Sequence, residues 1–398
     1  MRILHIDESF HTQYGYHTAP IAKEQVKLGH EVFVLTVEAD KLYPVFSEFG
    51  DNTSQQQILE YDREFEKEYG VKIVRCKVFG YISYRAVYKN EIYRIIDNIN
   101  PDVIFCHNSD SLMAIRLILR KEKYPTMYDS HMLEMASENK FSKLYLKAYR
   151  LIVSPILRKR KSIIVRTQDD PYIIDKEQIP KEQAPFISFG TDTTIFHPDK
   201  LIRKRFREEN DIGLNDFVVV YTGKLNKEKG ADLLAEVTKA HYDVGQYSGI
   251  VFLIVGNTKG EYGENIERAF SSSNNRILRF PSQKYTELAQ FYQASDLSVF
   301  PKQCSMSFYD AQACGLPVLS EDNSVNVDRC SNSNGFNFVN GNADSFISLL
   351  QKILVLQPDE YKKYSINAQE FIAKNYSYSS IAKEYTEMLT KVYENSKA

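Results

Sequence analysis

Short runs of β-branched and apolar residues alternate along the whole chain with longer segments whose apolar residues recur at helical spacing. This alternation predicts parallel strands joined by crossover helices, which is the α/β class. Gly29, for example, is expected to end the first helix just before the second strand. The predicted strands lie at 2–6, 31–37, 71–78, 102–108, 125–131 and 162–167 in the first half, and at 217–223, 249–256, 276–280, 297–301, 316–320 and 335–339 in the second.

The chain length and one turn-rich segment predict two domains. At 398 residues the chain is too long for one ordinary core. The segment PFISFGTDTTIFHPD, residues 185–199, is rich in turn residues and separates the two sets of strands. We therefore expect two Rossmann-like, doubly wound domains, 1–185 and 186–375, that face each other across a cleft. Ligands of such sheets bind at the carboxyl ends of the strands.

The composition argues against several classes of protein. The net charge of -2 argues against a protein that coats nucleic acid. The five cysteines form no CxxC pair, so a disulfide framework or a zinc site is not expected, and a reducing cytoplasm fits best. The N-terminus lacks the apolar core of a signal peptide, and no apolar run is long enough to span a membrane. These features predict a cytoplasmic protein.

Two lysines lie between a predicted strand and a predicted helix. The strand FVVVYTG is followed by KLNKEKG, which contains Lys224 and Lys229, and then by the helix ADLLAEVTKAH. Backbone N–H groups, the helix dipole and two ammonium groups would meet there, an arrangement suited to a diphosphate. A solvated lysine loop is the alternative interpretation.

A lone acid lies in a similar place further along. After the strand LSVFP, the turn KQCSMS leads into a helix that is expected to end near Cys314. Ser305 or Ser307 can cap this helix, and Asp310 lies about one turn inside it. A carboxylate there can accept two hydrogen bonds at once, which suits a vicinal diol such as a ribose. The alternative is a surface acid that is favourable to the helix dipole.

The first half offers weaker candidates. Gly15 lies in the loop after the first strand, and His107 and His131 each end a predicted strand at the expected cleft edge. The three spaced glycines of a dinucleotide site are absent, which disfavours a nicotinamide-dependent dehydrogenase. No Asp-x-Asp and no cluster with metal-ligand spacing occurs. The sequence therefore predicts no metal site.

Taken in order, these segments resemble the retaining nucleotide-sugar glycosyltransferases of family 4, which have the GT-B fold. GYHTAPIAKEQVKLGHEVFVLT looks like the opening loop and helix of the family, and YDSHMLE resembles its strand-end histidine segment. ISFGTDTTIFHP resembles the interdomain segment, YTGKLNKEKG resembles GRL…KG, and DAQACGLPV resembles EAMA.G.PV. YSYSSIAKEYTEMLTKVY resembles the C-terminal helix, which implies that residues 376–398 cross back onto the first domain.

The resemblance implies a set of site residues. Lys224 and Lys229 fall on the Arg and Lys that bind the donor diphosphate, and Gly223 precedes them. Asp310 takes the place of the second Glu of the family's Glu–seven residues–Glu motif, which binds the donor ribose. The remaining donor contacts that the family implies are His131 at the sugar, Gly15 near the diphosphate, and the backbone amides of Ser305, Met306 and Ser307.

One departure from the family pattern concerns the first Glu of that motif. Lys302 stands in its place, and the turn is about three residues shorter than usual. Gln303 or Ser305 is then expected to contact the sugar as an uncharged hydrogen-bonding group.

The implied activity is that of a metal-independent hexosyltransferase. It moves a sugar, with retention, from a nucleoside-diphosphate sugar to a carbohydrate or lipid-linked hydroxyl acceptor in glycan, glycolipid or polysaccharide biosynthesis. The sugar nucleotide is a co-substrate, and no cofactor and no nucleic acid are expected. Two alternatives are a catalytically degenerate GT-B protein that binds a nucleotide or a partner, and a sugar-nucleotide epimerase on the same fold.

Residues 141–161 form a predicted helix with one basic face, which indicates contact with a membrane surface. Acidic residues are absent from 141–165, and apolar and aromatic residues fill the other side of the predicted helix. This pattern predicts peripheral contact with an anionic membrane at its inner face. Packing on the first sheet is the alternative, and Pro155 would kink or split the helix. The residues that share the basic face are Lys143, Lys147, Arg150, Ser154, Arg158 and Lys161.

Overall fold

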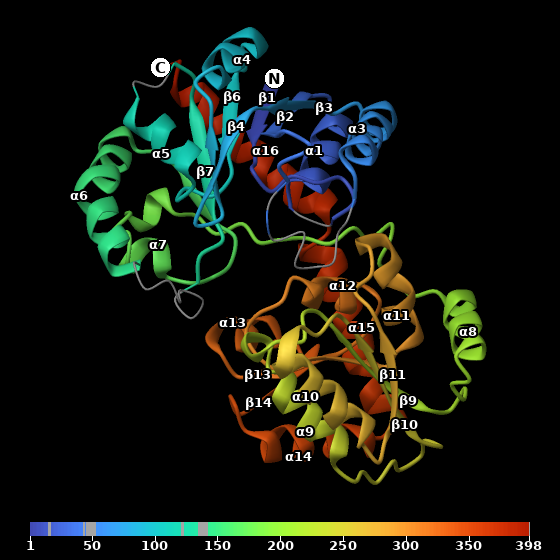
Figure 1. Cartoon of the computed structure of the whole chain (residues 1–398). Helices are drawn as coiled ribbons and strands as arrows, with labels where there is room; N and C mark the ends of the chain where they lie inside the picture. Colours follow the sequence, from blue (N-terminus) through green and yellow to red (C-terminus); the bar gives the residue numbers. More distant parts are fainter. Residues whose placement is uncertain (15–16, 43, 45–52, 121–122, 134–141, 398) are drawn as a thin grey trace. The chain divides into compact units, whose positions relative to one another are not determined.

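The computed structural model divides the chain into two compact units. It describes residues 1–14, 17–42, 44, 53–120, 123–133 and 142–397. The first unit comprises Met1–Phe189 and Tyr378–Ala398, and the second comprises Gly190–Ser377. Both chain ends belong to the first unit, to which the last helix, red in Figure 1, returns.

A six-stranded parallel sheet forms the centre of the first unit. Its strand order, β3-β2-β1-β6-β7-β8, is that of a doubly wound Rossmann-like sheet. The predicted strands of the first half are confirmed, and the parallel pairing brings the ends of β1, β6 and β7 to one edge. The strands are β1 (Arg2–Ile6), β2 (Glu31–Val37), β3 (Lys72–Cys76), β6 (Val103–Cys106), β7 (Thr126–Ser130) and β8 (Ile164–Arg166).

Helices cover both faces of this sheet. Alternate strand residues such as Val32 and Val34 pack against α1 (Thr18–Lys27) and α3 (Gln55–Tyr69), and α16 (Tyr378–Asn395) lies beside α1. The other strand residues form the larger core with the helices of the opposite face. These helices are α4 (Ile92–Ile99), α5 (Leu112–Leu119), α6 (Ser142–Arg160) and α7 (Tyr172–Asp175), and η2 (Lys181–Gln183) follows.

The second unit repeats the same plan. Its parallel sheet has the order β11-β10-β9-β12-β13-β14, so the two Rossmann-like folds that the sequence predicts are confirmed. The strands are β9 (Phe217–Thr222), β10 (Ile250–Val255), β11 (Arg276–Phe280), β12 (Leu297–Phe300), β13 (Val318–Glu321) and β14 (Gly335–Phe338).

The helices of the second unit also lie on two faces. On one face, α9 (Ala231–Lys239), α10 (Gly260–Ser271) and α14 (Ala343–Leu354) contribute to the main core. The remaining helices are α8 (Lys200–Glu209), α11 (Ala289–Ala294), α12 (Ser307–Ala313), α13 (Ser324–Arg329) and α15 (Pro358–Asn375), with the short turns η3 (Lys227–Lys229) and η4 (Tyr285–Leu288).

A two-stranded hairpin in the first unit does not follow from the sequence patterns. It joins β4 (Val78–Ile82) to β5 (Arg85–Tyr88) in an antiparallel pair. Its two central residues, Ser83 and Tyr84, have φ values of 48° and 65°. Such turns usually carry Asn or Gly at these positions, so the turn lacks the usual hairpin signal.

Helix α6 turns the predicted basic face partly inward. The helix runs through Pro155 without a break. Ser154 is buried and donates a 2.7 Å hydrogen bond to the carbonyl of Glu177. Arg150 and Arg158 donate to the carbonyls of Lys176 and Gln178. Much of this face therefore packs on the segment that follows α7.

The outward side of α6 carries both apolar and basic side chains. Leu144, Leu151 and Ile152 are 68%, 69% and 55% exposed, and Lys143 and Lys147 are exposed beside them. None of the helices over the described residues has the length and apolarity that a membrane crossing requires.

Candidate functional site

The lysine loop lies against the turn that follows β12. Gly230, with φ 70°, ends η3, and a Cβ there would lie 3.1 Å from side-chain atoms of Pro301 and Lys302. This close approach brings Lys229 to the turn, where its Nζ donates a 3.2 Å hydrogen bond to the carbonyl of Cys304. The structure thus brings together two segments that the sequence singled out separately.

Burial and charge both act on Lys229. Burial lowers the pKa of its ammonium group, and the positive charge of Lys224 acts in the same direction. Lys229 is therefore not the solvated lysine of the alternative interpretation. An anion between the two ammonium groups would relieve their repulsion.

Side chains from β13 and α13 hold the turn itself. Gln303 has a left-handed conformation, with φ 61°, and its backbone N–H donates a 2.7 Å hydrogen bond to Oε1 of Glu321. Asn326 donates to the carbonyl of Gln303 at 3.3 Å, and Arg329 donates to the carbonyl of Ser305 at 3.0 Å. The sequence did not single out Glu321, Asn326 or Arg329.

Helix α12 begins at Ser307, directly after this turn. Met306 is its N-cap residue and makes no side-chain cap. The amide of Ser307 donates to the hydroxyl of Ser305 at 3.2 Å, so one of the three predicted donor-binding amides has a partner within the turn. The side chains of Gln303, Ser305 and Met306 are neither fully buried nor fully exposed.

Asp310 lies in the interior of the second unit. It is 4% exposed, which excludes the surface-acid alternative. Its Oδ1 accepts a 2.6 Å hydrogen bond from the hydroxyl of Thr191 and a 3.0 Å hydrogen bond from that of Tyr285. Burial raises the pKa of the carboxyl group to about 7, against the effect of these two hydrogen bonds.

In the first unit, the two predicted histidines both lie against the buried carboxylate of Asp129. Nδ1 of His107 lies 2.7 Å from Oδ2 of Asp129, and Nε2 of His131 lies 3.4 Å from the same oxygen. On the other side, Nε2 of His107 lies 3.0 Å from Nδ1 of His5, whose Nε2 lies 2.7 Å from Oε1 of Gln25. The strand ends of β6 and β7 place these groups at one edge of the sheet.

Among these side chains, Asp129 and His107 are the two whose pKa values shift toward the charged form. Burial opposes both charges, yet the two histidines hold the pKa of Asp129 well below its usual range. Burial likewise opposes the charged form of His107, but the carboxylate of Asp129 raises its pKa overall. His131 therefore stands next to the buried carboxylate of Asp129.

His17 lies beside these side chains, among the rings of His107, His131 and Phe189. Neither of its ring nitrogens has a hydrogen-bond partner among the described residues. Across those same residues, no group of three or more His, Cys, Asp or Glu side chains is placed to hold a metal ion. Gly15, predicted near the diphosphate, lies outside the described residues.

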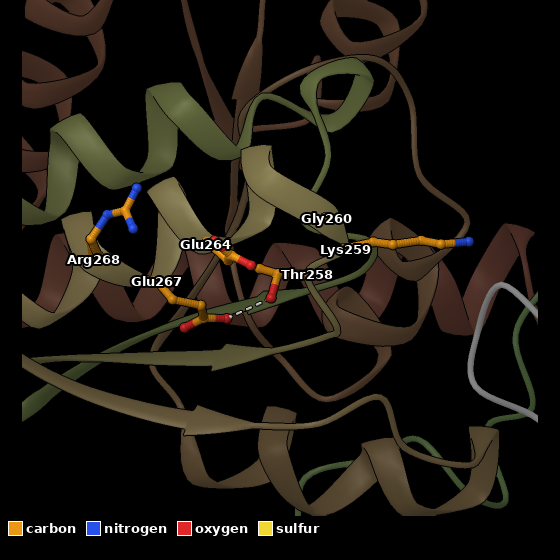
Figure 2. Close-up of a pocket in the computed structure, with 6 residues that line it drawn as sticks. All are labelled: Thr258, Lys259, Gly260, Glu264, Glu267 and Arg268. Carbon is orange, nitrogen blue, oxygen red and sulfur yellow. Dashed lines mark hydrogen bonds between the residues drawn. The ribbon is translucent and has the colours of Figure 1, made fainter.

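A separate open pocket lies at the start of α10, after the end of β10 (Figure 2). Its volume is about 450 Å³. Thr258 donates a 3.0 Å hydrogen bond to Glu267, and Lys259 extends away from the other lining residues. Its two acids, Glu264 and Glu267, balance its two basic residues, Lys259 and Arg268, so the lining has no net positive charge to attract a diphosphate.

Both units match models of glycosyltransferase families. Residues 15–194 match the family described as Glycosyltransferase Family 4, and residues 202–371 match the one described as Glycosyl transferases group 1. A "Probable sucrose-phosphate synthase" of Thermosipho melanesiensis is 23% identical over 93% of this chain and 89% of its own length. A "D-inositol 3-phosphate glycosyltransferase" of Corynebacterium aurimucosum is 26% identical over 44% of each chain.

Solved structures share the fold over nearly the whole chain. A glycosyltransferase from Rickettsia africae has a TM-score of 0.74 at 14% identity and covers 99% of both chains. Anabaena HepE, in complex with UDP and glucose, has a TM-score of 0.73 at 15% identity and covers 98% of this chain and 100% of its own.

The two Rossmann-like units, each with its own family match, define a glycosyltransferase with the GT-B fold. Within that class, the chain belongs to the family 4 type, as the resemblance of its motifs predicts.

The raised pKa of Asp310 predicts a pH-dependent effect of Asp310→Asn on stability. The unfolded chain loses this proton near pH 4, whereas the folded protein keeps it until about pH 7. Stability contributed by the protonated form is therefore present below pH 4 and is lost as the pH rises to 7. Asn cannot ionise, so Asp310→Asn should gain about 2.5 kcal/mol of stability relative to wild type between pH 5 and pH 8, because only wild type loses stability over this range.

Chemical unfolding followed by circular dichroism at the two pH values measures this difference, since the chain has no tryptophan. Effects of the substitution that do not depend on pH cancel in the comparison. An equal difference at pH 5 and pH 8 would show that Asp310 is already ionised in the folded protein.

Proposed function

We propose that this glycosyltransferase transfers a hexose from a nucleoside-diphosphate sugar to a hydroxyl acceptor with retention at the anomeric carbon. The observation that carries the proposal is the contact of Lys229 with the turn before α12, which joins the predicted diphosphate loop to the predicted donor motif. The complex of Anabaena HepE with UDP and glucose supports a nucleotide-sugar donor. The relatives do not favour an epimerase or a protein that only binds a nucleotide.

In this proposal, catalysis is mainly electrostatic and positional. Lys224 and Lys229 stabilise the charge of the leaving diphosphate, and the ordered turn fixes the donor. An oxygen of the leaving phosphate takes the proton of the acceptor hydroxyl, so no protein nucleophile and no metal ion are invoked. His131 contacts the donor sugar, and Asp310 accepts the ribose hydroxyls at Oδ2, since both protein hydrogen bonds fall on Oδ1.

The diphosphate site predicts that Lys224→Ala and Lys229→Ala each weaken donor binding. Removing one charge-assisted contact should lower the affinity for nucleoside diphosphates by about 10–100-fold. Titration calorimetry with uridine, guanosine and adenosine diphosphates measures the loss. Lys227→Ala is the matched control, because Lys227 is an exposed lysine of the same loop. Unchanged affinity in both variants would place the diphosphate elsewhere.

The ribose contact predicts that Asp310→Asn weakens the donor through the ribose hydroxyls. At pH 8, where the carboxyl group is ionised, loss of a charged acceptor should lower the affinity about tenfold or more for the ribose form of the donor. The same substitution should have a smaller effect on the 2′,3′-dideoxy form, whose hydroxyls are already gone. Equal losses for the two forms would mean that Asp310 supports the helix and does not contact the ribose.

We further propose that α6 holds the enzyme at the cytoplasmic face of an anionic membrane, where a lipid-linked acceptor would lie. The argument rests on the outward stripe of Leu144, Leu151 and Ile152, whose exposed apolar surface is flanked by Lys143 and Lys147. An apolar stripe bordered by lysines fits the boundary between acyl chains and anionic headgroups.

The membrane proposal predicts that Leu151→Ser together with Ile152→Ser lowers binding to vesicles that contain phosphatidylglycerol. Two exposed apolar side chains should contribute at least about tenfold in partitioning, without a change in stability. A vesicle sedimentation assay measures this loss. The matched control pairs Leu201→Ser with Leu214→Ser, because these leucines are 81% and 75% exposed in the second unit. Absence of wild-type binding to these vesicles at low salt would contradict the proposal.

A further inference from the structure

The turn after β12 lacks the acid that the family motif places there, yet a carboxylate reaches the turn from another strand. Lys302, which stands in the place of that acid, is exposed. Glu321 is the last residue of β13, the neighbour of β12 in the sheet, and its carboxylate contacts the backbone of Gln303. The adjacent strand thus supplies an acid to the position that Lys302 leaves without one.

The two oxygens of Glu321 differ in their surroundings. Oε1 accepts hydrogen bonds from the amide of Gln303 at 2.7 Å and from the side chain of Asn323 at 3.1 Å. Oε2 is buried and has no hydrogen-bond partner among the described residues. A buried carboxylate oxygen without a partner is costly, so a structural role for Oε1 alone does not explain the placement of the side chain.

The surroundings of Glu321 belong to the proposed donor site. Burial lowers the pKa of Lys229, and the charge of Glu321 is one of the effects that oppose this lowering, so the carboxylate acts on the proposed diphosphate lysine. Asn326 and Arg329 fix the carbonyls on either side of Cys304, the residue whose carbonyl Lys229 contacts. Glu321 therefore stands among groups that hold the same turn.

We propose that Glu321 is the acid of the donor-sugar subsite: Oε1 holds the left-handed turn at Gln303, and Oε2 accepts a hydrogen bond from a hydroxyl of the donor sugar. The inference rests on the proposed function, because it assumes a nucleoside-diphosphate sugar as donor. Oε2 is covered, so the sugar reaches it when the side chains of the turn move aside.

The test compares a nucleoside diphosphate with its sugar form. Glu321→Gln keeps the size of the side chain and one acceptor oxygen but removes the charge. Binding of UDP, GDP and ADP and of their glucose forms is measured by calorimetry for wild type and variant. Glu321→Gln should weaken the glucose form by about tenfold or more, while the affinity for the diphosphate alone changes by less than about twofold.

Two matched controls separate the sugar contact from general effects. Asp328→Asn removes an exposed acid of the neighbouring helix α13, and Lys302→Ala removes the residue in the usual position of the acid. Neither should change the difference between the sugar form and the diphosphate. If Glu321→Gln does not fold, Glu321→Asp keeps the charge but withdraws it by one methylene, and the same selective loss is expected.

Each other outcome has a distinct meaning. Equal weakening of the diphosphate and its glucose form would show that Glu321 only supports the turn, which overturns the proposal. Unchanged binding of both would overturn it as well. If wild type binds none of the six compounds, the proposed donor function fails first, and the role of Glu321 fails with it. Wild-type binding of a glucose form with selective loss in Glu321→Gln supports both.

Discussion

The structure of the proposed donor site depends on how the backbone of one irregular turn is satisfied. Residues 301–306 connect β12 to α12 and lie outside both elements, so their backbone polar groups need other partners. Side chains provide these partners: Glu321 accepts from Gln303, Arg329 donates to Ser305, and Lys229 donates to Cys304. The three side chains come from the end of β13, from α13 and from the loop after β9, so segments at one edge of the parallel sheet fix the turn without any regular secondary structure in it.

In the first unit, buried polar side chains likewise serve as hydrogen-bond partners for one another. The same edge of its sheet carries His5, His107 and Asp129, all buried, so their polar atoms must bond to one another. Asp129 also accepts the amide of Asn108 at 2.7 Å, which leaves its carboxylate with several donors. A buried carboxylate satisfied in this way is rigid, and it gives His131 a fixed neighbour at the end of β7.

Much of the fold follows from local patterns in the sequence, whereas the site depends on long-range contacts. Central strands such as β9 and β10 are fully buried apolar runs, which have a strong signature, and the turn at Ser83 and Tyr84 has none. The partners of Asp310 are Thr191, which is 119 residues away in the sequence, and Tyr285, so neither its burial nor its raised pKa follows from its own segment.

The role of Glu321 and the orientation of α6 likewise depend on long-range contacts. In the sequence, Glu321 is an ordinary acid at the end of a strand, and only the neighbouring turn shows that one oxygen is engaged and the other is not. In α6, helical spacing separates basic from apolar positions but does not tell which side meets the core. Three side chains of the basic face donate hydrogen bonds to the carbonyls of Lys176, Glu177 and Gln178. These hydrogen bonds set the rotation of the helix.

Two ionisable side chains of the second unit, Lys229 and Asp310, are buried at a cost to stability. This cost is consistent with a role in ligand binding. Burial lowers the pKa of Lys229 and raises that of Asp310, so the fold disfavours the charge on each. A diphosphate would add negative charge beside Lys229, and ribose hydroxyls would supply further donors to Asp310. Both groups would then gain more from the donor than solvated groups could, because they have already lost their water. A fold optimised only for stability would place neither charge in the interior, so their position favours a site prepared for a ligand that carries both phosphate and hydroxyl groups.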